Sequence, residues 1–192
     1  MSGSESVSFE EEDKSFNSED LEKMNIQLEQ NDTNIRVDQE YKTAKSDKYL
    51  SSLGCSVGRE ENNKYLINAT IIGPKNTPFY GGFYKLKIEF PANYPKSPPN
   101  VYFVTKIFHP NVYSDGKICI EVINDWNPNY SIINILDAIY ILLLHPNENS
   151  SANYEAGKLI KEDKNCEKEG KDNPHNYEKK AREWNSQFAY PI

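Results

Sequence analysis

Residues 64–106, KYLINATIIGPKNTPFYGGFYKLKIEFPANYPKSPPNVYFVTK, decide the fold of this 192-residue chain. Three runs within them, 64–72, 83–90 and 101–106, are rich in β-branched and aromatic residues and show the alternation typical of strands. The segments between the runs are rich in glycine, proline and asparagine, which favour turns. Three or four strands joined by short turns predict an antiparallel meander.

Helices are predicted on both sides of these strands. Residues 35–54 form an amphipathic pattern that ends at Gly54, a typical C-terminal glycine of a helix. The apolar stretch 131–144 begins at Ser131, whose hydroxyl is suited to an N-cap. Two further helical segments are expected at 154–162 and 176–190. A charged surface loop is expected between them, at 163–174. Strands first and helices last indicate an α+β fold.

The first 34 residues differ in composition from the rest of the chain. They hold ten acidic residues and two lysines, a net charge of −8, so the remaining residues sum to +1 within the total of −7. Such a segment buries too little surface to offset its ordering entropy, although a weak helix start is visible at Ser18. We therefore expect a largely disordered acidic extension over residues 1–34 and one core domain over residues 35–192. The nearly neutral core gives no support for nucleic-acid binding.

The sequence contains no signal for a membrane or a secreted location. The stretch 131–144 is interrupted by polar residues and is shorter than the ~20 residues that cross a bilayer. The first residues lack the basic region and apolar run of a secretory signal. Cys55, Cys119 and Cys166 have the spacing of neither a disulfide framework nor a zinc site. A soluble cytoplasmic or nuclear protein with free thiols is expected.

Cys119 lies in an apolar run, where a cysteine is usually inert. Hydrolytic cysteine chemistry needs a base near the thiol, but the chain has only three histidines. His109 is followed by Pro110, which stiffens the turn, and is expected to bond to local backbone. His145 and His175 are expected at the surface near helix ends. No ligand pair has a usual metal spacing and no glycine-rich phosphate loop is present, so neither a metal nor a cofactor is expected.

A thiol can carry an acyl group with little activation. Free cysteine is partly ionised at neutral pH and is intrinsically very nucleophilic. Exchange of an acyl group between two thiols is nearly balanced, so it needs no general base. Attack by an amine on the resulting thioester needs stabilisation of the oxyanion. The neutral amide of Asn111, on the loop stiffened by Pro110, is suited to this task.

The segment HPNVYSDGKIC, with eight residues from Asn111 to Cys119, resembles the signature of the ubiquitin-conjugating enzyme family. The resemblance extends over residues 35–192 and follows the order of the family. It includes INATIIGPKNTPFYGG, the stretch FYKLKIEFPANYPKSPPNVYFVTKIFHPN, the Trp-x-Pro at Trp126 to Pro128, and NYEKKAREWNSQFAY. It implies an α+β fold with an N-terminal helix, a four-stranded antiparallel meander, an active-site segment and C-terminal helices.

The resemblance also implies a reaction. Cys119 would accept the C-terminus of ubiquitin from the activating enzyme as a thioester and pass it to a substrate lysine, usually with a ligase. ATP would be used by the activating enzyme and not by this chain. Asn111 would stabilise the oxyanion or support the loop. His109 and Pro110 would be structural, as would Trp126 and Pro128.

The chain departs from the family pattern near the expected ligase surface. Cys119 and Trp126 are seven residues apart, whereas most members have eight, so the intervening loop is one residue shorter. Lys96 occupies a position where several members present a phenylalanine for ligase docking. Asn129 follows Pro128 in place of a small apolar residue. A more polar surface favours a RING-type ligase over a HECT-type one.

Two other departures concern the transfer step and the activating enzyme. Ser150 falls where many members carry an acid near the thioester, so it is a candidate gate residue. Asn147 in the same loop is expected to hold the loop's shape. Lys42 and Lys45 of the first helix are expected to contact the activating enzyme, although acidic residues interrupt that face.

Other functions remain open at the level of sequence. The nearest alternative is the same chemistry with another modifier, SUMO or NEDD8. The SUMO enzyme has a longer loop before the tryptophan and a basic surface, and this chain lacks both. The NEDD8 enzyme has a basic N-terminal extension, whereas the extension here is acidic. A non-catalytic scaffold variant would typically have lost the cysteine. A cysteine hydrolase would need a base. A monomer that acts on protein substrates is expected.

Overall fold

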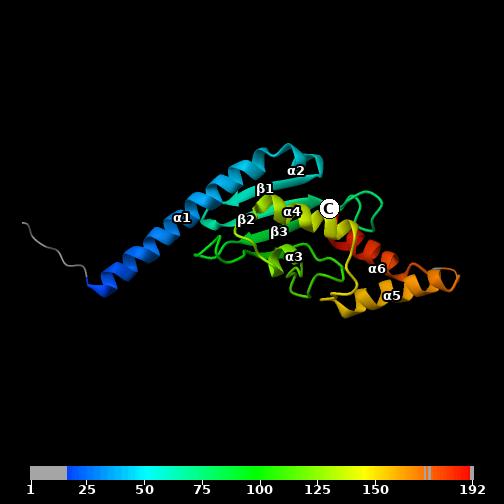
Figure 1. Cartoon of the computed structure of the whole chain (residues 1–192). Coiled ribbons are helices and arrows are strands. Elements are labelled where there is room, and N and C mark those ends of the chain that lie inside the picture. The colour runs from blue at the N-terminus through cyan, green and yellow to red at the C-terminus, as the bar shows by residue number, and fades with distance from the viewer. Residues whose placement is uncertain (1–16, 171, 173, 191–192) are drawn as a thin grey trace, which may run out of the picture.

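Four strands form one antiparallel sheet in the order β1-β2-β3-β4 in the computed structural model, which describes residues 17–170, 172 and 174–190 (Figure 1). The strands are β1 (Cys55–Glu60), β2 (Asn63–Ile72), β3 (Phe83–Glu89) and β4 (Asn100–Phe103). The predicted meander and the α+β class are confirmed.

The alternation in β3 shows why the sheet has one buried face. Tyr84, Leu86 and Ile88 are buried, whereas their neighbours along the strand are exposed. The register pairs Ile88 with Ile67 of β2 on one side and with Val101 of β4 on the other. Buried side chains of three strands thus meet on the same face.

The residue pattern missed the first strand. Residues 58–63, GREENN, have the composition of a turn, but β1 continues through Gly58 and Arg59 to Glu60. Its backbone pairs with β2 from Cys55 opposite Ile71 onward, and this pairing decides the conformation of a stretch with weak strand propensity of its own. Only residues 61 and 62 are left for the turn.

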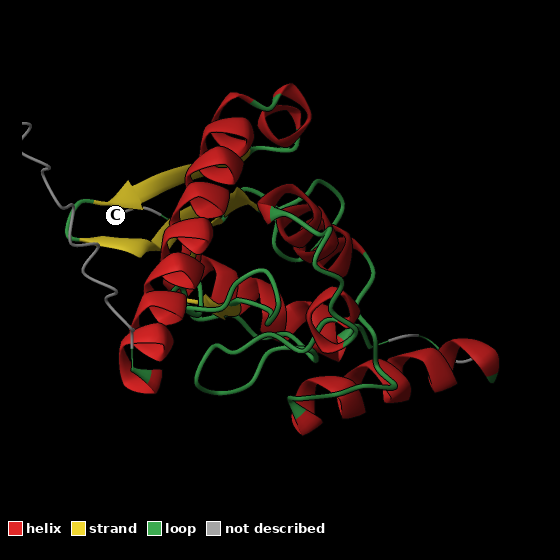
Figure 2. Cartoon of the chain, turned by 60° about the vertical axis from the view of Figure 1, so that its left-hand side comes forward, coloured by secondary structure: helices red, strands yellow, loops and turns green. Residues whose placement is uncertain are grey.

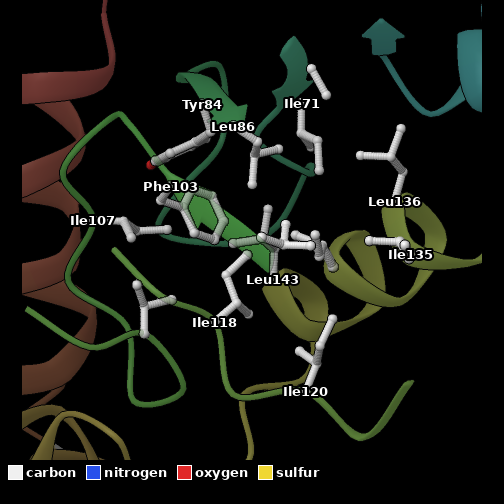
Figure 3. Packing of buried hydrophobic residues seen from close by; sticks show 14 of the residues in the cluster. Ile71, Tyr84, Leu86, Phe103, Ile107, Ile118, Ile120, Ile135, Leu136 and Leu143 are labelled. Carbon is white, nitrogen blue, oxygen red and sulfur yellow. The ribbon is translucent and has the colours of Figure 1, made fainter. Parts of the chain in front are cut away.

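Six α-helices and one π-helical turn surround the sheet. They are α1 (Ser18–Ser46), α2 (Lys48–Ser52), α3 (Glu121–Asn124), α4 (Ile132–Leu144), α5 (Tyr154–Lys168), α6 (Asn176–Trp184) and η1 (Asn185–Ala189), among the residues described. Helices α1 and α5 lie at opposite ends of the body (Figures 1 and 2). Figure 3 shows Ile135 and Leu143 of α4 directed toward the same interior as Leu86 and Phe103 of the sheet.

The N-terminal helix starts where the sequence showed a weak helix start and is longer than that signal indicated. It begins at Ser18 and runs through residue 34, so residues 18–34 are helical and the expected domain boundary falls inside a helix. The side chain of Asn17 accepts from the backbone N–H of Asp20, which caps the first turn. Residues 1–16 lie outside the described part of the chain.

The helix expected over residues 35–54 is divided in two. Helix α1 ends at Ser46 because Asp47 has an extended backbone, and the Asp47 carboxylate then caps α2 by accepting from the N–H of Leu50. Gly54 follows α2 with a φ of +74°, as the C-terminal glycine pattern predicted.

The segment expected to be a charged loop, 163–174, is partly helical. Helix α5 continues to Lys168 because Asp163 is turned inward and buried. Its carboxylate accepts from the backbone N–H groups of Asn176 and Tyr177, at 3.2 and 3.0 Å, at the start of α6. A charged residue that looked solvated therefore joins two helices.

Candidate active site

The two isoleucines that flank Cys119 hold it at the surface. Ile118 and Ile120 are both buried, as Figure 3 shows. Because successive side chains of an extended segment point to opposite sides, burial of both turns the intervening thiol outward. The apolar run that makes the cysteine look inert is thus the anchor of a half-buried, accessible thiol.

The segment 111–119 folds back on itself and brings Asn111 beside Cys119. The backbone N–H of Cys119 donates to the carbonyl of Asn111 at 2.9 Å, and Val112 is bridged to Ile118. Gly116 makes the turn with a φ of +89°, and a Cβ there would lie 2.2 Å from a carbonyl oxygen of β4. This close approach fixes the position of the thiol against the sheet.

The thiol opens into a hollow of about 750 Å³ between α3, α4 and the loop 145–153. Two polar side chains contact the sulfur: Ser150 Oγ lies 3.7 Å from it and Asn124 Nδ2 lies 3.6 Å from it. The acidic residues Glu121 and Asp125 also line the hollow. These charges suit the approach of an ammonium group to the sulfur.

The side chain of Asn111 is occupied by the neighbouring loop. It is 1% exposed, and its Nδ2 donates to the carbonyl oxygens of Asn147 at 2.8 Å and Ser150 at 2.9 Å. Its Oδ1 accepts from the backbone N–H of Asn147 at 2.9 Å. An amide has two N–H donors, so both are used here. Of the two roles expected for Asn111, the geometry favours support of the loop.

His109 is enclosed in the protein and is not in contact with the thiol. Its Nδ1 accepts from the backbone N–H of Asn111 and its Nε2 donates to the carbonyl of Leu142, both at 3.1 Å. Burial lowers the pKa of His109 to about 4, so the ring is neutral at pH 7. Pro110 uses its carbonyl to accept from the N–H of Asn153 at 2.8 Å. Both residues thus hold backbone groups of neighbouring segments in place.

Two surface loops are joined beside the hollow. Trp126 Nε1 donates to the carbonyl of Pro95 at 2.8 Å, which ties the loop after α3 to the loop after β3. Lys96 is exposed and pairs with Glu29 of α1 at 2.6 Å. Pro128 and Asn129 are exposed on the other loop, where the Pro128 carbonyl accepts from Arg36 at 3.4 Å. The predicted ligase-contacting residues thus lie on two connected loops.

A buried glutamate joins these loops to the helices. Glu40 was expected to interrupt a basic surface, but it is buried and turned inward. Its carboxylate pairs with Arg36 and accepts from the hydroxyl of Tyr94 at 2.7 Å and from the N–H of Ile132 at 2.9 Å. Lys42 and Lys45 are exposed on the same helix, away from these contacts.

Sequence reasoning missed the residues of the hollow that come from α3 and the end of α4. Asn124 lies five residues after the cysteine, in a stretch with no long periodic pattern that would predict a helix. Its N–H donates to the carbonyl of Ile120 at 3.0 Å, and this helical turn brings the side chain back to the thiol. His145, which was assigned no role, also lines the hollow.

The described residues contain neither a metal-binding cluster nor a membrane-spanning helix. In that part of the chain no three His, Cys, Asp or Glu side chains gather closely enough to hold a metal ion. None of the helices there combines the length and the apolar character that crossing a membrane requires.

The sequence is similar to ubiquitin-conjugating enzymes over most of the described region. The family model described as ubiquitin-conjugating enzyme matches residues 36–185. A relative from Arabidopsis thaliana, "Ubiquitin-conjugating enzyme E2 3", is 44% identical over 113 residues, which are 58% of this chain and 75% of the relative. A relative from Caenorhabditis elegans, "Ubiquitin-conjugating enzyme E2 1", is 46% identical over 112 residues, which are 58% of each chain.

Proposed function

The chain belongs to the ubiquitin-conjugating enzyme family, and we propose that Cys119 is the residue on which this ubiquitin-conjugating transferase carries ubiquitin. The observation that supports this proposal is the half-buried thiol itself, anchored by two buried isoleucines and open to a hollow of about 750 Å³. Among the described residues the sulfur's hydrogen-bond partners are Ser150 and Asn124, and neither is the base that hydrolytic chemistry needs.

The first step is an exchange of thioesters. The Cys119 sulfur attacks the carbonyl carbon of ubiquitin's C-terminus on the activating enzyme, a new S–C bond forms, and the activating enzyme's thiolate leaves. The thiol proton passes to solvent. Because one thioester replaces another, the exchange is nearly balanced and needs no strong base.

The second step transfers ubiquitin to a lysine. The amine, once neutral, attacks the same carbonyl carbon, an N–C bond forms, the Cys119 thiolate is expelled, and the proton lost by the nitrogen passes to water. Glu121 and Asp125 line the hollow and favour the approach of the positively charged side chain. Ser150, with its hydroxyl 3.7 Å from the sulfur, lies where the acceptor must pass.

The partners follow from the surfaces around the site. We propose that Lys42 and Lys45 contact the activating enzyme, which consumes the ATP, and that this chain uses no cofactor of its own. The joined loops carrying Lys96 and Asn129 favour a RING-type ligase, because Lys96 is charged and exposed where an apolar contact would need an aromatic ring. A cytoplasmic or nuclear location and a monomeric state are part of the same proposal.

A charging assay tests the function directly. The full chain is incubated with activating enzyme, ATP and ubiquitin, and the products are separated without reductant. We expect a band larger by one ubiquitin that disappears on addition of a thiol and is absent in Cys119→Ala. Cys166→Ala is the matched control, because Cys166 is also half-buried but lies on α5, and it should charge normally.

Other outcomes would redirect the proposal. Charging by SUMO or NEDD8 with their own activating enzymes, and not by ubiquitin, would change the modifier. Charging that survives in Cys119→Ala would reject Cys119 as the carrier. Absence of charging with all three modifiers would favour the scaffold alternative.

A further inference from the structure

We propose that the side-chain amide of Asn124, rather than that of Asn111, donates the hydrogen bond that stabilises the oxyanion when an amine attacks the Cys119 thioester. This inference rests on the proposed function, since it concerns the transfer step. It is carried by the hydrogen bonds at the site, which occupy the N–H groups of Cys119 and of the Asn111 amide but leave the amide of Asn124 with the sulfur as its partner.

The donors of the two residues joined at the site, Cys119 and Asn111, are already bonded. The backbone N–H of Cys119 donates to the carbonyl of Asn111 at 2.9 Å. Both N–H groups of the Asn111 amide are bonded to the carbonyls of Asn147 and Ser150. Recruiting either group for the reaction would leave a carbonyl oxygen without its hydrogen-bond partner, which is unfavourable for a buried group.

Asn124 presents the contrasting situation. Its Nδ2 lies 3.6 Å from the Cys119 sulfur, and within the described part of the chain this weak contact is the one hydrogen bond of its side chain. Thiol sulfur is a poor acceptor, so the donor can turn to a better one at little cost. The side chain is exposed in the hollow, so it meets an incoming acyl group without rearrangement of the core.

The geometry matches the position of the developing charge. The carbonyl carbon of the thioester is bonded to Sγ, and its oxygen is one bond further, so the oxygen falls within reach of a donor located 3.6 Å from Sγ. Effective oxyanion donors lie about 2.7–3.1 Å from the charged oxygen. Helix α3 is fixed at both ends, by the bond of Cys119 to Asn111 and by the bond of Trp126 to Pro95. This restricts the positions that the amide can adopt.

The attacking group is a neutral lysine amine. The nitrogen lone pair forms the N–C bond, the carbonyl π pair moves to the oxygen, and the oxyanion accepts from Asn124 Nδ2. The oxygen pair then restores the carbonyl while the S–C bond breaks and Cys119 leaves as thiolate. The proton lost by the nitrogen passes to water or buffer base in the open hollow.

Single-turnover discharge is the test. The full chain is charged with ubiquitin, and magnesium is then chelated so that the activating enzyme can no longer use ATP to recharge it. Free lysine is added, and loss of the thioester is followed without reductant. We expect Asn124→Ala to discharge about 10-fold more slowly, less than the 10²–10³ seen for enclosed oxyanion sites, because this hollow is open to water. Asn124→Asp keeps the shape but replaces the donor with a negative charge, so it should be slower still. Asn124→Gln, which keeps an amide, should recover part of the rate.

A second readout separates oxyanion stabilisation from a structural role. Alkylation of Cys119 by iodoacetamide depends on the exposure and ionisation of the thiol but forms no acyl oxyanion. We expect the alkylation rate of Asn124→Ala to stay within about threefold of the original, as the sulfur contact is weak. Asn165→Ala, an exposed asparagine on α5, is the control for discharge and should match the original chain.

The proposal is overturned if Asn124→Ala or Asn124→Asp discharges at the original rate, or if alkylation falls as much as discharge. Failure of the unsubstituted chain to charge would reject the proposed function instead, and charging is measured before lysine is added. The two failures are therefore distinguished within one experiment.

Discussion

The hollow has two unlike walls, and each contains an asparagine. We call the first the buried wall: it consists of the loop 145–153, which is exposed or half-exposed, and the buried residues His109 and Asn111 behind it, whose ring and amide groups are bonded to backbone. The open wall consists of Cys119 and α3, where the amide of Asn124 has the sulfur as its partner. The same side-chain amide is thus structural on one wall and available for chemistry on the other, because burial commits the first to neighbouring backbone.

This difference explains how a thiol without a neighbouring base can be held in a fixed position beside Ser150. The buried wall is held together by hydrogen bonds that would be costly to break, so the loop carrying Ser150 is fixed relative to Cys119. The open wall can then exchange weak contacts for contacts with substrate. Rigidity and reactivity are divided between the two sides of one hollow.

Removing the amide of the buried wall should have the largest effect on stability. Asn111→Ala loses three hydrogen bonds to the backbone of Asn147 and Ser150, so we expect the free energy of unfolding in urea to fall by about 3 kcal/mol. Asn149→Ala, an exposed neighbour on the same loop, should change it by less than about 0.5 kcal/mol. Equal effects of the two substitutions would contradict the contrast between the walls.

The buried wall should also make stability depend on pH. His109 has a pKa of about 4 in the folded chain against an ordinary value of 6.5. Between these values the unfolded chain binds a proton that the folded chain does not, so stability falls as the pH falls. We expect a loss of about 2 kcal/mol between pH 7 and pH 5, measured by urea unfolding at each pH.

Two variants identify the source of this pH dependence. His109→Gln should remove the loss between pH 7 and pH 5, whereas His145→Gln, in the exposed part of the hollow, should retain it. A folded-state NMR titration provides an independent check, since the His109 ring signals should not shift between pH 8 and pH 5.5. A midpoint of the His109 titration near 6.5 would show that the ring is not held neutral.

The fold was largely predictable because most of its elements carry their own periodic signal. The runs at 64–72 and 83–90 and the apolar helix after Ser131 lie where the pattern placed them. β1 was missed because its conformation comes from pairing with β2, and the extent of α5 was missed because Asp163 caps a helix that follows in the sequence. Contacts between distant segments do not appear in local periodicity.

The site was predictable in its position but not in the assignment of its hydrogen bonds. Cys119, Asn111 and Ser150 were expected together, and the structure brings them together. The occupancy of the Asn111 amide depends on the loop 145–153, more than thirty residues away, so no local pattern shows it. Asn124 reaches the thiol only because the segment Glu121–Asn124 forms a helical turn. Sequence indicated which groups are present, while the bonds decide which are free.

Removing the amide of the open wall, that of Asn124, should have the smallest effect on stability. Asn124→Ala gives up one weak contact to sulfur and replaces asparagine with a better helix former at the end of α3. The free energy of unfolding in urea should therefore stay within about 0.5 kcal/mol of the original, measured beside Asn111→Ala in the same series. A loss above about 1 kcal/mol would mean that Asn124 supports α3, and slower discharge in this variant would then follow from a displaced thiol instead of a missing donor. Unchanged stability with slower discharge would assign the two asparagines to different tasks, one to the structure of the hollow and one to its chemistry.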